Sequence, residues 1–170
     1  MRCEKTYLRR CNGVEQTISF AETLAKHLKP GDVVLLNGEM GAGKTQFVKG
    51  IARGLGITEN IVSPTFNIVL SYEHATLPLN HFDLYRLEDE CELEDIAYWE
   101  LLEGDRASFV EWGDRFPESL PYDYLELDFV VSQADVREIR CQAHGGRAES
   151  LLEAWASCSE SKLEVLDCLK

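Results

Sequence analysis

Apolar positions along the chain change from helix-like to strand-like spacing, and glycine and proline stand at the boundaries. A first helix is predicted from a capping box at residues 19–22 until Pro30 and Gly31 stop the helical pattern. Residues 33–37 then form a short, continuous apolar run rich in β-branched and leucine side chains. Such a run predicts a strand that is buried on both faces.

The remainder of the chain alternates in the same way. Helices are predicted where apolar residues recur every three or four positions, and strands where they form short runs or alternate with polar residues. The short connections between two pairs of strands favour antiparallel hairpins, and the later hairpin is expected at an edge of the sheet. The predicted helices span residues 45–55, 87–103 and 151–155, with residues 163–169 as an extension or a separate short helix. The further predicted strands span residues 65–72, 79–84, 107–112, 124–131 and 136–143.

A glycine-rich turn joins the buried strand to the helix at residues 45–55. Its sequence, GEMGAGKT, matches G-x-x-x-x-G-K-[ST] at every fixed position. Such a loop curls its backbone N–H groups around nucleotide phosphates, and the following helix adds its positive N-terminal end. Lys44 is expected to reach the β- and γ-phosphates, and the Thr45 hydroxyl to bind Mg²⁺. The predicted nucleotide-binding residues of the loop are Glu39, Met40, Gly41, Ala42, Gly43, Lys44 and Thr45.

Hydrolysis of a bound nucleotide also needs a carboxylate near the metal or the attacking water, usually at the end of a neighbouring strand. Asp83 in HFDLYRL and Glu111 in FVEW are the two candidates, although either could be an ordinary carboxylate at a strand end. Thr65 in SPTF begins a predicted strand, where many P-loop proteins place a hydroxyl that senses the γ-phosphate. The sequence leaves open which of the two carboxylates contacts the metal.

These elements predict an α/β fold, namely a single P-loop NTPase-like domain with a mixed parallel and antiparallel sheet flanked by helices. A chain of 170 residues with 45% hydrophobic content can form one domain with a substantial core. The P-loop ATPase domain is expected at residues 1–158, with its core at about 14–155. Residues 159–170 are expected to be a C-terminal extension, either a short helix or a loose tail.

The formal net charge of −13 argues against a large contact with nucleic-acid backbones, which requires clustered lysine and arginine. No apolar run approaches the roughly 18 residues needed to span a bilayer, and the N-terminal residues lack the apolar stretch of a signal peptide. A cytoplasmic location without membrane contact is therefore expected.

Cysteine and histidine residues show no metal-binding pattern. The cysteines are irregularly spaced and are expected to be reduced thiols. Cys141 and His144 form a lone C-x-x-H pair without a second pair at a zinc-like distance, so no metal site is predicted there. The six cysteines are Cys3, Cys11, Cys91, Cys141, Cys158 and Cys168, and the remaining histidines are His27, His74 and His81.

Four motifs, in the order GEMGAGKT, SPTF, HFDLYRL and VEW, resemble those of the TsaE (YjeE-like) family. The similarity of layout runs from about Val14 to about Trp155. The resemblance implies a single-domain ATPase that works with the proteins TsaB and TsaD, which form the core that transfers threonylcarbamoyl to an adenosine of tRNA. It further implies that ATP hydrolysis is coupled to turnover of this core, and that tRNA is contacted only through the complex.

The resemblance also implies roles for individual residues. Lys44 and Thr45 would act on phosphate and metal, and Thr65 would respond to the bound nucleotide. Asp83 and Glu111 would serve the Mg²⁺ and the water. Trp112 would lie close to the nucleotide.

Two other functions use the same phosphate loop. A small-molecule kinase would require an acceptor pocket and usually an arginine-bearing lid, and no arginine-rich insert is present in the sequence. A regulatory GTP switch would normally carry D-x-x-G and N-K-x-D elements, and neither string occurs. A scaffold that binds nucleotide without hydrolysing it remains a third alternative.

Overall fold

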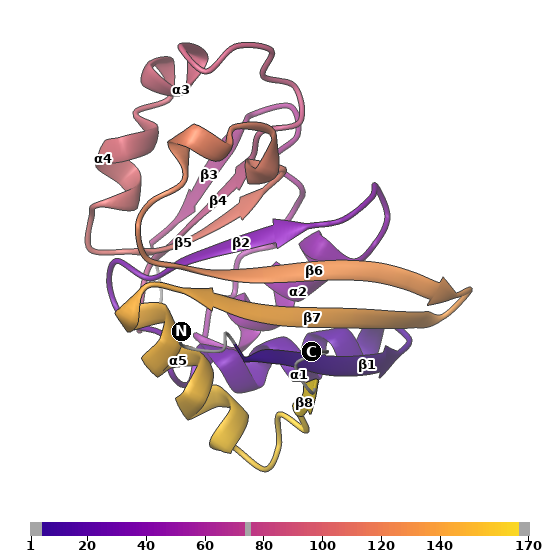
Figure 1. Ribbon diagram of the computed structural model, residues 1–170. Helices are drawn as coiled ribbons and strands as arrows, with labels where there is room; N and C mark the ends of the chain where they lie inside the picture. The colour runs from indigo at the N-terminus through magenta and orange to yellow at the C-terminus, as the bar shows by residue number, and fades with distance from the viewer. Residues whose placement is uncertain (1–4, 74–75, 167–170) are drawn as a thin grey trace.

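The computed structural model describes residues 5–73 and 76–166, which fold around a mixed sheet of eight strands (Figure 1). The strand order is β3-β4-β5-β2-β6-β7-β1-β8. The strands are β1 (Thr6–Asn12), β2 (Val33–Asn37), β3 (Val69–Tyr72), β4 (Leu79–Asp83), β5 (Ala107–Glu111), β6 (Tyr124–Gln133), β7 (Val136–His144) and β8 (Glu164–Leu166). The helices are α1 (Val14–Ala25), α2 (Lys44–Gly54), α3 (Glu92–Asp95), α4 (Tyr98–Leu102) and α5 (Gly146–Ser157), with 3₁₀ turns at Gly113–Arg115 and Pro117–Ser119. The predicted fold class is confirmed.

Parallel pairing is centred on β2, the strand that precedes the glycine-rich loop. β2 pairs in parallel with β5 on one side and with β6 on the other, and β4 is parallel to β5. The remaining neighbours pair antiparallel. Because parallel strands end at the same edge of a sheet, the C-terminal ends of β2, β4 and β5 lie together.

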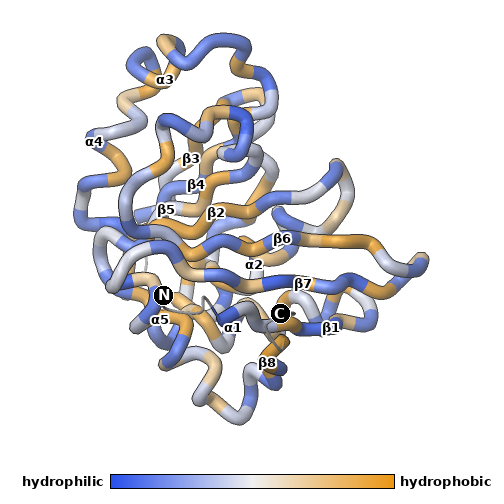
Figure 2. The backbone as a smooth tube through the Cα atoms, viewed as in Figure 1, coloured by the Kyte–Doolittle hydropathy of each residue, from blue (hydrophilic) through white to orange (hydrophobic). Residues whose placement is uncertain are grey.

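Side chains of β2 alternate between two hydrophobic cores. Val34 and Leu36 belong to a core with residues of α1, α2 and α5, which continues under β6 and β7. Val33 and Leu35 belong to a second core on the opposite face, with residues of α3 and α4. Figure 2 shows hydrophobic stretches concentrated in the strands at the centre of the sheet, whereas the loops around α3 are hydrophilic. Burial on both faces explains why β2 carries a continuous apolar run.

The β6–β7 hairpin lies inside the sheet, not at its edge as predicted. β1 pairs antiparallel with β7, from Tyr7 opposite Cys141 to Asn12 opposite Val136. β8 then pairs with the other side of β1. The sequence did not predict β1, because only Tyr7 and Cys11 among its residues are buried and polar side chains interrupt the alternation.

Two predicted helices have different bounds in the structure. α1 begins directly after Gly13, so Ser19 lies within the helix and is not the cap that the sequence predicted. The single helix predicted at residues 87–103 is two short helices, α3 and α4. Ala97 lies immediately before α4 with a φ of 53°, a left-handed conformation that a continuous right-handed helix does not contain.

The C-terminal region contacts the sheet. Strand β8 pairs with β1, so the helix predicted at residues 163–169 is wrong as far as residue 166, and Leu169 lies outside the described residues. α5 begins at Gly146, earlier than predicted, and its Trp155 stacks on Phe20 of α1 with ring centroids 4.5 Å apart. The Trp155 indole N–H also donates to the Thr23 hydroxyl at 2.7 Å. The division of the chain after residue 158 stays a prediction.

The cysteines of the described residues, Cys11, Cys91, Cys141 and Cys158, are free thiols. Cys3, Cys168 and His74 lie outside those residues. Cys141 faces the core, where burial raises the pKa of its thiol well above the ordinary value. His144 instead contacts Glu126, at 2.7 Å. Within residues 5–73 and 76–166, we find no helix with the length and apolar character that crossing a membrane requires.

Gly50 allows α1 and α2 to approach closely. A Cβ atom at this position would lie 2.3 Å from the Ile18 carbonyl oxygen and 2.6 Å from Cβ of Ala21. Because the first of these atoms is backbone, we predict that Gly50→Ala lowers the free energy of unfolding by about 1–3 kcal/mol, despite the helix propensity of alanine. Gly146→Ala is the matched control, since a Cβ there meets no atom within 4 Å. Urea unfolding followed by circular dichroism measures the stability of both variants. Equal stability of the two would contradict this packing.

Candidate nucleotide-binding site

The predicted phosphate loop, residues 38–45, connects the end of β2 to the start of α2. Gly38 has a φ of 139°, and a Cβ there would lie 2.6 Å from the carbonyl oxygen of Phe129 in β6. A glycine is therefore required for this contact between loop and sheet. The loop ends at the N-terminus of an 11-residue helix, whose free backbone N–H groups attract anions.

Lys44 is held inside the loop. Its side chain donates from Nζ to the carbonyl oxygens of Gly38, at 2.5 Å, and Glu39, at 2.9 Å. The residue is only 4% exposed. Burial lowers the pKa of the Lys44 ammonium from its ordinary value, and nearby carboxylates act in the opposite direction. The loop thus holds a cation at the place where the motif requires one.

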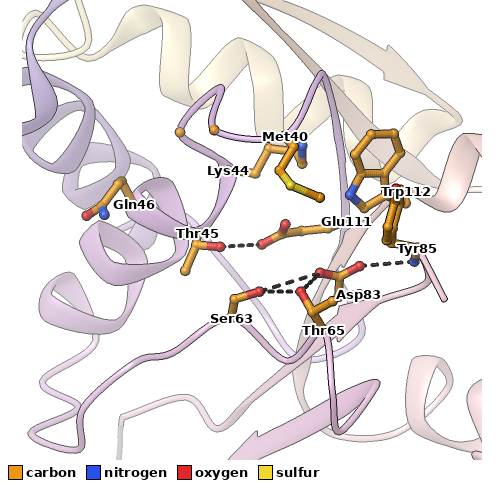
Figure 3. A pocket seen from close by; sticks show the side chains of 12 residues that line it. Met40, Lys44, Thr45, Gln46, Ser63, Thr65, Asp83, Tyr85, Glu111 and Trp112 are labelled. Atoms are coloured by element: carbon orange, nitrogen blue, oxygen red, sulfur yellow. Dashed lines mark hydrogen bonds between the residues drawn. The ribbon is translucent and has the colours of Figure 1, made fainter.

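Two carboxylates lie beside the loop at the C-terminal ends of β4 and β5. Asp83 and Glu111 are paired in register, and Leu36 of β2 is paired with Glu111 on the other side. Both acidic residues are buried, at 3% and 4% exposure. Thr45 donates from Oγ1 to Oε1 of Glu111 at 3.0 Å (Figure 3). The sheet register therefore brings the second half of the predicted site to the first.

A turn before β3 brings two hydroxyl groups to Asp83. Thr65 donates from Oγ1 to Oδ2 of Asp83 at 2.6 Å, and Ser63 Oγ lies 2.7 Å from the Thr65 oxygen. The carbonyl oxygen of Pro64 accepts the N–H of Ile68 at 2.5 Å, which closes the turn. The strand predicted from Thr65 therefore begins four residues later, because the apolar pattern of this segment continues through the turn.

Aromatic rings form one side of the site. Trp112 has a left-handed φ of 61°, which is uncommon for a residue other than glycine. Its ring centroid lies 4.5 Å from Lys44 Nζ, and the Tyr85 ring lies against it with centroids 5.0 Å apart. Arg115 donates to the backbone carbonyls of Leu84 and Tyr85. Figure 3 shows the two rings side by side next to the Lys44 side chain.

A cleft of about 390 Å³ lies among these groups. The predicted residues that line it are Met40, Gly41, Gly43, Lys44, Thr45, Thr65, Asp83, Glu111 and Trp112. Glu39 and Ala42 are absent from its lining: the Glu39 carbonyl binds Lys44, and Ala42 belongs to the hydrophobic core. The structure thus brings most of the predicted residues together, and their chemical roles stay predictions.

Four further residues of the site were not predicted. Gln46, Ser63 and Tyr85 line the cleft, and the buried His81 lies behind it, with Nε2 2.8 Å from Oε1 of Glu111. A signal for His81 exists in HFDLYRL, because residues two apart on a strand share a face and Asp83 follows two residues later. Spacing along the sequence does not reveal the pair, since the partner of His81 is a carboxylate on another strand.

The donor atoms around the cleft suit Mg²⁺. Thr45, Asp83 and Glu111 offer oxygen atoms only, which hard divalent cations prefer. In the part of the chain that the structure describes, we find no group of three or more His, Cys, Asp or Glu side chains that could hold a metal ion. Two carboxylates and a hydroxyl match the magnesium sites that phosphate oxygens and water complete. The residues therefore fit a magnesium–nucleotide complex.

Comparison with known proteins gives consistent matches over most of the chain. The sequence profile of the family described as "Threonylcarbamoyl adenosine biosynthesis protein TsaE" matches residues 11–139. Among curated proteins named "tRNA threonylcarbamoyladenosine biosynthesis protein TsaE", that of Bacillus subtilis (strain 168) is 45% identical over 82% of this chain and 87% of the relative. The protein of Treponema pallidum (strain Nichols) with the same name is 39% identical over 76% of this chain and 97% of its own.

A solved structure agrees with the sequence matches. The crystal structure of YdiB from Bacillus subtilis superimposes with a TM-score of 0.79 at 36% identity, covering 92% of this chain and 97% of YdiB. The family profile thus spans the loop and both carboxylates, and the structural match covers most of the chain. The chain belongs to the TsaE family.

Proposed function

We propose that this protein is a Mg²⁺-dependent ATPase that couples ATP hydrolysis to turnover of the TsaB–TsaD complex in tRNA threonylcarbamoyladenosine synthesis. The observation that carries the proposal is the meeting of Lys44 and Thr45 with Asp83 and Glu111 at one cleft. The pathway is supported by the names of relatives that cover most of the chain. A cytoplasmic location is part of the same proposal.

Binding is assigned to the loop and the N-terminus of α2. Backbone N–H groups at a helix N-terminus and the ammonium of Lys44 both attract phosphate oxygens. Because Lys44 is buried, few water molecules compete for its charge, which strengthens its attraction to a phosphate. Trp112, whose ring faces Lys44, forms the wall beside the phosphates in this proposal.

Hydrolysis is assigned to the carboxylates and the hydroxyls that they hold. A bound Mg²⁺ supplies positive charge that polarises the γ-phosphate and its leaving oxygen. Thr45 and Asp83 are proposed to face the metal, and Glu111 to orient the attacking water. The Thr65 hydroxyl donates a hydrogen bond to Asp83. Loss of the γ-phosphate can therefore alter the conformation of the turn before β3 through this hydrogen bond.

The proposed partners are TsaB and TsaD, and tRNA is reached through them. A net charge of −13 disfavours direct contact between this protein and the tRNA backbone. An acidic surface can instead dock on a basic surface of a partner protein. The complex would thus supply both the nucleic-acid contact and the transfer chemistry.

We predict that Lys44→Ala weakens ATP binding about tenfold to a hundredfold, because a charged donor to the phosphates is lost. Lys49→Ala is the matched control, since Lys49 lies on the same helix outside the cleft lining and its loss changes the net charge equally. Isothermal titration calorimetry measures both affinities. An unchanged affinity for Lys44→Ala would refute the assignment of this residue.

A different outcome is expected for Glu111→Gln, which keeps the shape of the side chain and removes its charge. ATP affinity should persist while kcat falls about 100-fold or more, because the water loses the group that orients it. Steady-state phosphate release with the partner proteins present measures kcat. Normal hydrolysis by this variant would transfer the proposed role to Asp83, which Asp83→Asn then tests.

The proposed function as a whole is tested by measuring ATPase activity with and without a purified TsaB–TsaD pair. We expect the pair to raise the rate, and GTP to replace ATP poorly. A rate that the pair leaves unchanged would contradict the coupling. Transfer of the γ-phosphate to a small acceptor would instead indicate the kinase alternative.

A further inference from the structure

His81 is a buried histidine to which neither the motif nor the proposed mechanism assigns a task. It lies on β4, two residues before Asp83, and is 0% exposed. Its Nε2 lies 2.8 Å from Oε1 of Glu111, whereas Nδ1 has no hydrogen-bond partner among the described residues. The imidazole therefore interacts with the site through one nitrogen only.

The partner of Nε2 determines the direction of this hydrogen bond. When the Glu111 carboxylate is ionised, its oxygen atoms only accept hydrogen bonds, and the contact then requires the proton on Nε2 of His81. The same Oε1 atom accepts the Thr45 hydroxyl at 3.0 Å. Within the described residues, no hydrogen bond to the other oxygen, Oε2, is present, and Figure 3 shows it pointing away from Thr45. One oxygen of Glu111 is thus held by two donors while the other stays available.

The two donors differ in their access to the cleft. Thr45 lines the cleft and is a proposed ligand of the metal, so its hydroxyl responds to what is bound. His81 is fully buried and absent from the cleft lining, so a bound nucleotide or metal does not contact its ring directly. Groups that fix the orientation of a reacting carboxylate in this way commonly determine its effectiveness.

We propose that His81 is a positioning residue: through Nε2–H it anchors Oε1 of Glu111, so that Oε2 faces the reacting water. This inference rests on the proposed function, because it assigns Glu111 the task of orienting that water. Without the anchor, the carboxylate can rotate and present either oxygen, or neither. Loss of His81 then lowers the rate of hydrolysis without removing any group that contacts the nucleotide.

Two substitutions separate the hydrogen bond from simple packing. The side-chain nitrogen of glutamine can occupy the place of imidazole Nε2, whereas the nitrogen of asparagine reaches only the place of Nδ1, which has no partner. We expect His81→Asn and His81→Ala to lower kcat about 10–100-fold with nearly unchanged KM for ATP. His81→Gln should restore most of the rate. Equal rates for the Gln and Asn variants, or a normal rate for His81→Ala, would overturn the proposal.

A second measurement uses the wild-type protein without nucleotide or metal. Long-range ¹H–¹⁵N correlation spectra report which nitrogen of His81 carries a proton. We expect a proton on Nε2, and a changed Nε2 signal in Glu111→Gln. An unprotonated Nε2 would overturn the inference even if all three variants failed to fold. If the wild-type protein hydrolysed no ATP under any condition, the proposed function would fail, and these spectra alone would decide whether His81 donates to Glu111.

Discussion

The parallel pairing of β4, β5 and β2 is the constraint on which the site depends. It places Asp83, Glu111 and Leu36 in one row across the sheet, directly before the loop that contains Lys44. A shift of one residue between β5 and its neighbours would move Glu111 to the opposite face of the sheet. The apolar residues that precede each carboxylate prevent this shift, because they belong to two different cores and cannot exchange places.

This arrangement also makes the buried charges tolerable. A buried ammonium and two buried carboxylates would each be costly alone, since burial removes the water that stabilises charge. Here Lys44 donates to two carbonyl oxygens, while Asp83 and Glu111 accept hydrogen bonds from Thr65, Thr45 and His81. The result is a set of oriented polar groups at the C-terminal ends of the parallel strands, which is the usual place for ligands in α/β proteins.

The sequence was most informative where one local rule dominates. The strand, loop and helix at residues 33–55 followed from an apolar run, a fixed motif and a helical period, and the structure has them nearly as predicted. Prediction failed where tertiary contacts decide. Strand β1 contains polar residues, and it is a strand because it pairs with β7 and β8. The break between α3 and α4 occurs at Ala97, where no glycine or proline marks it in the sequence. His81 was missed for a related reason, because its partner Glu111 is adjacent only through strand pairing.

The central claim is that residues 38–45 enclose the phosphates of ATP and that Thr45 shares the metal with them. A crystal structure with Mg²⁺ and a non-hydrolysable ATP analogue tests this most directly. We predict that the phosphates lie against the N-terminus of α2, with Lys44 Nζ within hydrogen-bonding distance of the terminal phosphates and Thr45 Oγ1 bound to the metal. Phosphates lying outside the loop, with Lys44 still bonded only to the carbonyl oxygens of Gly38 and Glu39, would contradict it.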